Sequence, residues 1–133
     1  MATFFVKLGV WNCERPEKFE EFGVVVDAAE VFSRISRSRL ERLDVRAGRK
    51  MLFRMPDGRV IERELAAVQV AAEGRTALEN VVLTEDGEIE LLGSHTIEGF
   101  GLAVDQVQKK LVPTVMWALA IGNSQEPWLE ARS

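Results

Sequence analysis

The chain has 133 residues, 47% of them hydrophobic, which is enough for one domain with an apolar core that does not depend on disulfide bonds. A single cysteine, Cys13, excludes an internal disulfide and indicates a reducing compartment, so we expect a cytoplasmic protein with Cys13 buried or half-buried in an early strand. The net charge of −4 gives no electrostatic reason to expect a nucleic-acid partner.

Runs of β-branched and aromatic residues predict a mainly β domain with one or two short helices. In chain order we expect two strands at Thr3 to Val10 and Lys18 to Val26, followed by a short helix that begins with the capping-box pattern Ser38 to Glu41. Four strands follow, at Met51 to Met55, Val60 to Val70, Ala77 to Leu83 and Ile89 to Leu92. A helical turn at Ser94 to Glu98 and two strands at Leu102 to Val104 and Lys110 to Val112 complete the expected order. This order predicts one domain over residues 1–122 and a C-terminal tail over residues 123–133.

Two apolar stretches lack the patterns of export and of membrane insertion. Met1 to Trp11 is short, contains Lys7 and has no basic flank, so we expect no signal peptide. Leu111 to Gly122 contains Pro113 and is shorter than the roughly 20 residues that a membrane-spanning helix needs. We expect a buried strand or a subunit contact there, and no membrane partner.

Asp27 follows the β-branched run Val24 to Val26, which indicates a strand buried on both faces. The residues alone allow an ordinary interpretation of Asp27. In Asp27-Ala-Ala-Glu30 the aspartate would be the N-cap of a helix and the glutamate its third residue, with Val31, Phe32 and Ile35 at roughly helical spacing. A catalytic role for Asp27 depends on the resemblance described next.

Four stretches share the order of a known family. They are Val24-Val-Val-Asp27-Ala-Ala, Leu40-Glu-Arg-Leu-Asp-Val45, Met55-Pro-Asp-Gly-Arg-Val60, and Leu91-Leu-Gly-Ser followed by Gly101-Leu-Ala-Val-Asp105 and Lys110-Leu-Val-Pro113. Together they resemble the retroviral-type (retropepsin-like) aspartic peptidases, in particular the compact single-domain prokaryotic versions, over about residues 4–114. The resemblance implies the acid protease fold, a closed β-barrel with one domain per subunit.

The same resemblance implies the functional residues. Asp27 stands at the catalytic aspartate, Pro56, Asp57 and Gly58 form the tip of the flap hairpin that covers a bound peptide, and Gly93 packs against the active-site loop. It further implies a homodimer, an extended peptide or protein substrate, and no metal or organic cofactor. An exposed hairpin of no special function is the alternative interpretation of residues 56–58.

The family's Asp-Thr-Gly-Ala motif is altered in this chain. Ala28 and Ala29 replace the threonine and the glycine, and Glu30 replaces the small fourth residue. Ala28 lacks the hydroxyl that hydrogen-bonds across the dimer axis, the Cβ of Ala29 disfavours a positive φ, and an inward Glu30 would raise carboxyl pKa values. These changes predict weak, altered or absent hydrolysis by an Asp27 pair. A noncatalytic dimerisation or peptide-binding module on the same fold is the alternative function.

Two other features favour ordinary roles. His95 is the only histidine, so it completes no catalytic triad and has no partners for a metal site, and we expect it at the surface or at a helix start. The basic run from Arg34 to Lys50 is interleaved with Glu41 and Asp44, which indicates a solvated helix face.

Overall fold

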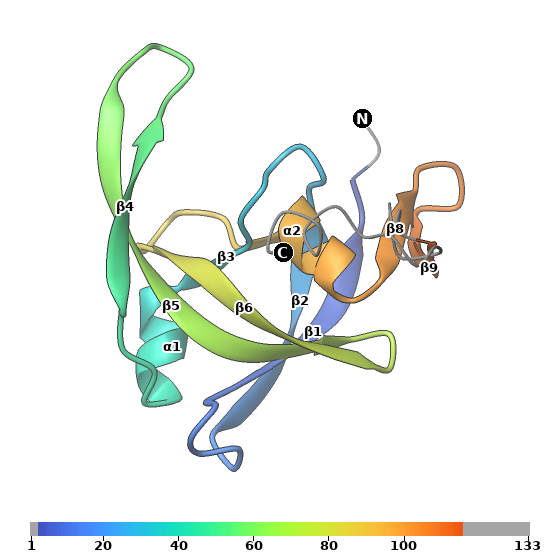
Figure 1. Cartoon of the computed structure of the whole chain (residues 1–133), viewed down its shortest axis with the longest axis horizontal. Coiled ribbons are helices and arrows are strands. Elements are labelled where there is room, and N and C mark those ends of the chain that lie inside the picture. The colour runs from blue at the N-terminus through green and yellow to red at the C-terminus, as the bar shows by residue number, and fades with distance from the viewer. Residues whose placement is uncertain (1–2, 116–133) are drawn as a thin grey trace, which may run out of the picture.

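The computed structural model describes residues 3–115, which form one mainly β domain with two short helices, as the sequence predicts (Figure 1). The elements are β1 (Phe5–Trp11), β2 (Phe19–Val26), β3 (Arg34–Ser36), α1 (Arg37–Arg42), β4 (Arg49–Arg54), β5 (Val60–Ala72), β6 (Arg75–Thr84), β7 (Leu91–Leu92), α2 (Ser94–Gly99), β8 (Leu102–Asp105) and β9 (Lys110–Pro113). The predicted domain boundary at residue 122 and the tail lie outside the described residues.

Seven of these strands form one mixed sheet in the order β1-β2-β7-β3-β6-β5-β4. An additional pairing between β1 and β5 joins the strands from β1 to β5 in this order into a ring. Within the ring, β2 pairs with β7 and β3 pairs with β6 in parallel. Strands β8 and β9 form a separate antiparallel pair. The ring therefore brings segments that are distant in sequence together at the end of β2.

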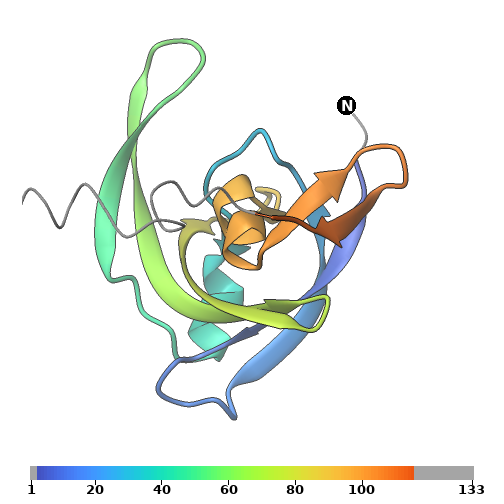
Figure 2. The same cartoon turned by 45° about the vertical axis from the view of Figure 1, so that its right-hand side comes forward.

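Strand β4 lies outside the ring and pairs with the first half of β5. The resulting β4–β5 hairpin stands away from the rest of the domain in both views (Figures 1 and 2). Strand β5 has 13 residues, and from Leu65 onward it pairs with β6 inside the ring. Because β5 belongs both to the hairpin and to the ring, the ring fixes the base of the hairpin.

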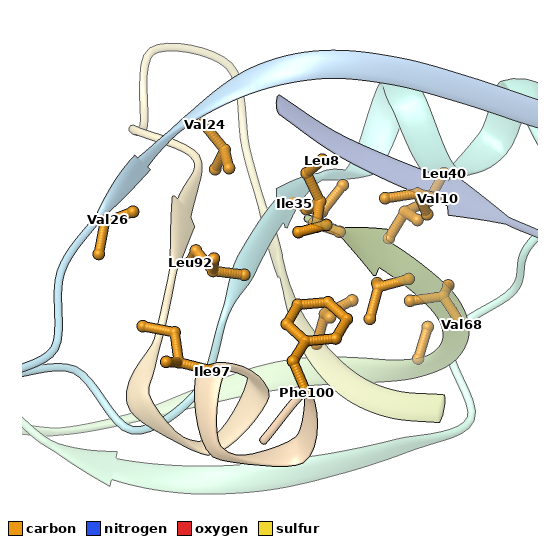
Figure 3. Packing of buried hydrophobic residues seen from close by; sticks show 14 of the residues in the cluster. Leu8, Val10, Val24, Val26, Ile35, Leu40, Val68, Leu92, Ile97 and Phe100 are labelled. Carbon is orange, nitrogen blue, oxygen red and sulfur yellow. The ribbon is translucent and has the colours of Figure 1, made fainter. Parts of the chain in front are cut away.

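Alternate residues of the ring strands point inward and form the core (Figure 3). Leu92 of β7 is fully buried and lies in the same cluster as Val26 of β2. Helix α2 adds Ile97, and Phe100 follows it into the core. The ends of β2 and β7 and the helix α2 are thus fixed by shared apolar contacts.

Several local predictions differ from the structure, and β3 was not among the expected strands. Helix α1 begins at Arg37 rather than at Ser38, because the side-chain oxygen of Ser36 caps it and accepts the Arg39 N–H at 3.2 Å. The strand predicted at Ile89 to Leu92 is limited to Leu91–Leu92. Cys13 is exposed in the turn between β1 and β2, not buried in a strand.

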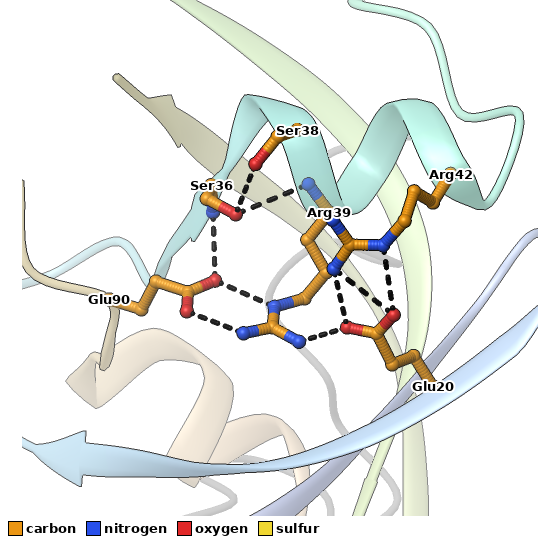
Figure 4. A network of polar contacts seen from close by, with 6 residues as sticks. All are labelled: Glu20, Ser36, Ser38, Arg39, Arg42 and Glu90. Atoms are coloured by element: carbon orange, nitrogen blue, oxygen red, sulfur yellow. Dashed lines mark hydrogen bonds and ion pairs between the residues drawn. The ribbon is translucent and has the colours of Figure 1, made fainter. Parts of the chain in front are cut away.

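Arginines of the basic run form ion pairs with other elements, so the predicted solvated helix face is only part of the description. The Arg39 guanidinium donates Nε to Glu90 Oε2 at 3.0 Å and Nη2 to Glu90 Oε1 at 2.9 Å, and it also pairs with Glu20 of β2 (Figure 4). It lies 3.6 Å from the ring centroid of Phe22. This network connects β2, α1 and the segment that leads into β7.

The network lowers the pKa values of both carboxylates. Burial opposes the charge on Glu90, but the hydrogen bonds from Arg39 and from the Ser36 N–H outweigh it, so the pKa of Glu90 lies below its ordinary value. Burial likewise opposes the charge on Glu20, and Arg42 and Arg39 together lower its pKa. Both carboxylates therefore favour the folded state in their ionised form.

Candidate active site

Asp27 lies directly after β2, beside the end of β7. Its backbone N–H donates to the carbonyl oxygen of Leu92 at 3.0 Å, which extends the parallel pairing of β2 with β7 by one residue. The chain then turns, and the carboxylate Oδ1 accepts the Ala29 N–H at 3.1 Å. Residues 27–33, hereafter the Asp27 loop, contain no helix, so the N-cap interpretation of Asp27 is wrong. The Asp27 side chain is held in a turn and remains partly exposed.

The three residues that depart from the family motif have distinct surroundings. Ala28 and Ala29 are exposed, and Ala28 lines a cavity of about 430 Å³ between the loop, α2 and β8. The carboxylate of Glu30 pairs with Arg34, with 3.1 Å between Oε2 and Nη2. The negative charge of Glu30 is therefore paired with the Arg34 guanidinium, four residues along the chain.

Gly93 lies against the Asp27 loop with no room for a side chain. A Cβ at this position would stand 2.7 Å from both the carbonyl oxygen of Val31 and the carbonyl carbon of Phe32. The Gly93 N–H donates to the buried Ser33 hydroxyl at 2.9 Å. Gly93 therefore packs directly against the backbone of the Asp27 loop.

Helix α2 is joined to the Asp27 loop by further hydrogen bonds. The N–H of Ser94 donates to the carbonyl oxygen of Glu30 at 2.7 Å, and the hydroxyls of Ser33 and Thr96 lie 2.6 Å apart. Ser33 and Thr96 are each 1% exposed, so their mutual hydrogen bond satisfies groups that water does not reach. Hydrogen bonds from the end of β7 and from α2 thus hold the Asp27 loop in place.

The predicted flap is the end of the β4–β5 hairpin. Gly58 has a φ of 92°, which glycine adopts without strain, and its N–H donates to the carbonyl oxygen of Met55 at 2.9 Å. The N–H of Arg59 donates to Asp57 Oδ1 at 3.0 Å, and this bond, followed by the Arg59 side chain, lowers the pKa of Asp57. Pro56 precedes them in the turn. These residues form a well-defined tip.

The hairpin contacts the Asp27 loop through its strand rather than through its tip. Phe53 of β4 meets Phe32 of the loop edge to face, with ring centroids 5.9 Å apart and planes at 85°. The tip at residues 56–58 stands away from the domain in Figure 1. The structure therefore brings Asp27 and Gly93 together and leaves the tip apart from them.

Sequence patterns did not single out several residues of this region. Ser33, Thr96 and the buried Glu79 of β6 all support α2, and Glu79 Oε1 lies 2.9 Å from Nδ1 of His95. One signal was available, because Glu79 stands between Ala77 and Val81 in the inward register of a strand. His95 is the second residue of α2, an exposed helix-start position as predicted.

Over residues 3–115, no three side chains of His, Cys, Asp or Glu gather in a way that could hold a metal ion. Neither helix in that range is long and apolar enough to cross a membrane.

Comparisons with protein-family models and with curated proteins find no match to this chain. A functional assignment therefore depends on the geometry of the chain's own residues.

Proposed function

We propose that this chain is one subunit of a homodimeric, retropepsin-like aspartic peptidase in which Asp27 of each subunit contributes one carboxylate. The meeting of two strand ends supports the proposal. Asp27 leaves β2 beside Leu92, and Gly93 leaves β7 against the Asp27 loop with no space for a Cβ. Two further contacts support it: strands β1 to β5 pair into a ring, and Phe53 of the β4–β5 hairpin meets Phe32 of the Asp27 loop.

The chemistry requires a second copy of the chain because one carboxylate cannot be base and acid at once. An ionised Asp27 takes a proton from water, whose oxygen bonds to the scissile carbonyl carbon, while the protonated Asp27 of the partner subunit protonates the carbonyl oxygen. In the next step the first carboxyl gives its proton to the amide nitrogen, the C–N bond breaks, and the second carboxylate takes a hydroxyl proton. Two carboxylates about 3 Å apart share one proton readily, since both cannot ionise cheaply.

Ala28 limits this activity and favours a second candidate function. In the family the threonine at this position hydrogen-bonds across the dimer axis, and the methyl group of Ala28 cannot. A noncatalytic module that binds an extended peptide on the same fold requires no such bond. The two functions differ in their dependence on the Asp27 carboxylate.

Turnover of a fluorogenic peptide library between pH 3 and 7 tests the peptidase. We expect slow cleavage by the wild type, none by Asp27→Asn, and wild-type rates for Asp86→Asn, a matched change in the exposed turn after β6. Cleavage that survives Asp27→Asn would exclude the Asp27 pair. Peptide binding without cleavage, unchanged by Asp27→Asn, would favour the module.

Restoring the family motif provides a gain-of-function test. Ala28 borders an open cavity, so Ala28→Thr introduces a hydroxyl without a buried clash. We expect the double variant Ala28→Thr, Ala29→Gly to cleave about fivefold faster or more, the equivalent of roughly one hydrogen bond.

Sedimentation equilibrium of the same proteins should give the mass of two chains, and a monomer at all concentrations would contradict the proposal.

A further inference from the structure

Glu79 is a buried carboxylate outside the proposed catalytic pair. Its side chain is 7% exposed, although it belongs to the inward row of β6 with Ala77 and Val81. A Cβ at Gly99 would stand 3.2 Å from Glu79 Oε2, so helix α2 passes closely over the carboxylate. Burial of a carboxylate is unfavourable unless it has a polar partner. His95 is the partner that the structure provides, with 2.9 Å between Nδ1 and Oε1.

His95 also contacts the Asp27 loop through its backbone. Its N–H donates to the carbonyl oxygen of Val31 at 3.0 Å, next to the bond from the Ser94 N–H to the carbonyl oxygen of Glu30. Two hydrogen bonds through one residue therefore connect the interior of β6 to the loop. A change in the bond between Glu79 and His95 acts on the first turn of α2, and that turn holds the loop.

Within residues 3–115, the other charged groups of the elements around His95 do not bond to its imidazole. Arg75 of β6 donates to the carbonyl oxygen of Phe100 at 2.9 Å, and Glu30 of the loop pairs with Arg34. Asp105 of β8 accepts backbone N–H groups of its own turn. Glu98 of α2 is exposed and forms no ion pair within residues 3–115. Over that range, Glu79 is the carboxylate bonded to the imidazole.

We propose that Glu79 and His95 are a positioning pair that holds the Asp27 loop more firmly when the imidazole is protonated. Imidazole side chains exchange their proton between about pH 5 and 8, and a charge-assisted hydrogen bond is roughly twice as strong as a neutral one. The inference rests on the proposed function, because the loop carries the catalytic carboxylate. The proposed peptidase needs one protonated carboxyl in each Asp27 pair, so it works on the acid side of neutral pH.

Backbone amide NMR across pH 4 to 8 tests the pair directly. We expect the Ala29 and Glu30 amide resonances to shift with the same midpoint as the imidazole Cε1 proton of His95 in the wild type and in the control Glu98→Gln. His95→Gln should abolish this loop transition, and Glu79→Gln should reduce its amplitude by at least half. The proposal would be overturned if the Ala29 and Glu30 amide resonances did not shift with the imidazole titration, or if their shifts were as large in Glu79→Gln as in the wild type. The wild-type titration decides even if a variant fails to fold.

Enzyme kinetics separate this inference from the proposed function. The ratio of kcat/KM between wild type and Glu79→Gln should grow as pH falls through the imidazole range, whereas a purely structural loss would lower activity equally at every pH. If no peptide is cleaved but the shared NMR titration is present, the peptidase proposal fails and the positioning pair stands. If Asp27-dependent cleavage occurs without a shared titration, only the positioning pair is overturned.

Discussion

Gly93 and Phe32 meet backbone to backbone, and a Cβ at position 93 would stand 2.7 Å from the carbonyl carbon of Phe32. Gly93 has a φ of −92°, a value that any residue adopts, so the demand for glycine is steric and not conformational. The contact fixes the distance between the end of β7 and the Asp27 loop. A single methyl group at this position would separate the two segments that form the candidate site.

We expect Gly93→Ala to lower the free energy of unfolding by about 1–3 kcal/mol, the usual result of overpacking a rigid site. The obstructing atoms belong to the backbone of Val31 and Phe32, so they cannot move aside as a side-chain end does. Urea unfolding measures the change. Gly23→Ala is the matched control, because no atom lies within 4 Å of its Cβ position. Equal stability of the two variants would contradict the close approach at Gly93.

Leu92→Ala should destabilise the protein by about 2–5 kcal/mol, since it leaves a cavity in the core between β2 and α2. Leu52→Ala removes the same atoms from a side chain that is 68% exposed, and we expect a change within about 0.5 kcal/mol. Thermal and urea unfolding compare the two. A small effect at Leu92 would show that β7 is not held by the core.

Arg39→Met should lower the stability at pH 7 by about 2 kcal/mol, between the values typical of exposed and of buried ion pairs. The pKa values of Glu20 and Glu90 are lowered, so their contribution is complete above their ordinary value of 4.5 and is lost as pH falls through the lowered values. The difference between wild type and variant should therefore be constant above about pH 5.5 and shrink toward pH 3.

Urea unfolding at several pH values measures the effect of Arg39→Met. Lys50→Met is the control, because the Lys50–Glu62 pair is more than half exposed on both sides and should contribute less than about 1 kcal/mol. A difference that grows toward acid pH would contradict the assigned network.

Phe32 and Phe53 should be energetically coupled by about 0.5–1.5 kcal/mol in a double-mutant cycle, the range for an edge-to-face aromatic pair. We also expect Phe53→Ala to speed amide hydrogen exchange in β4, because the hairpin then loses its contact with the loop. A parallel cycle between Phe53 and the exposed Phe5 should give no coupling. Similar coupling in both cycles would show that the aromatic contact has no specific effect.

Most strands of this fold were predictable because apolar residues alternate along them and turn residues separate them. Alternating apolar residues and the Pro56-Asp57-Gly58 turn predict the β4–β5 hairpin, and the Val24 to Val26 run predicts the strand that delivers Asp27. The mainly β architecture with two short helices follows from such local signals. The start of α1 was misplaced because Ser36 and Ser38 are both good caps, and only the path of β3 selects Ser36.

Residues that act through distant partners were harder to foresee. Arg39 lies on a short helix, and nothing in its neighbourhood along the chain identifies Glu20 and Glu90 as its partners. The sequence predicts Glu79 only as one residue of a strand, although its place between Ala77 and Val81 puts it in the inward register. Its partner His95 comes from a separate element, and their contact depends on how α2 crosses β6.

The parallel pairing of β2 with β7 has a consequence for the order of folding. The bond from the Asp27 N–H to Leu92 joins residues separated by most of the domain, and loops of this length close slowly. During synthesis, Asp27 leaves the ribosome long before Leu92 does, so the β1–β2 hairpin must persist with its last residues unpaired on that side. A nascent chain that stops before Gly93 therefore cannot contain the candidate site.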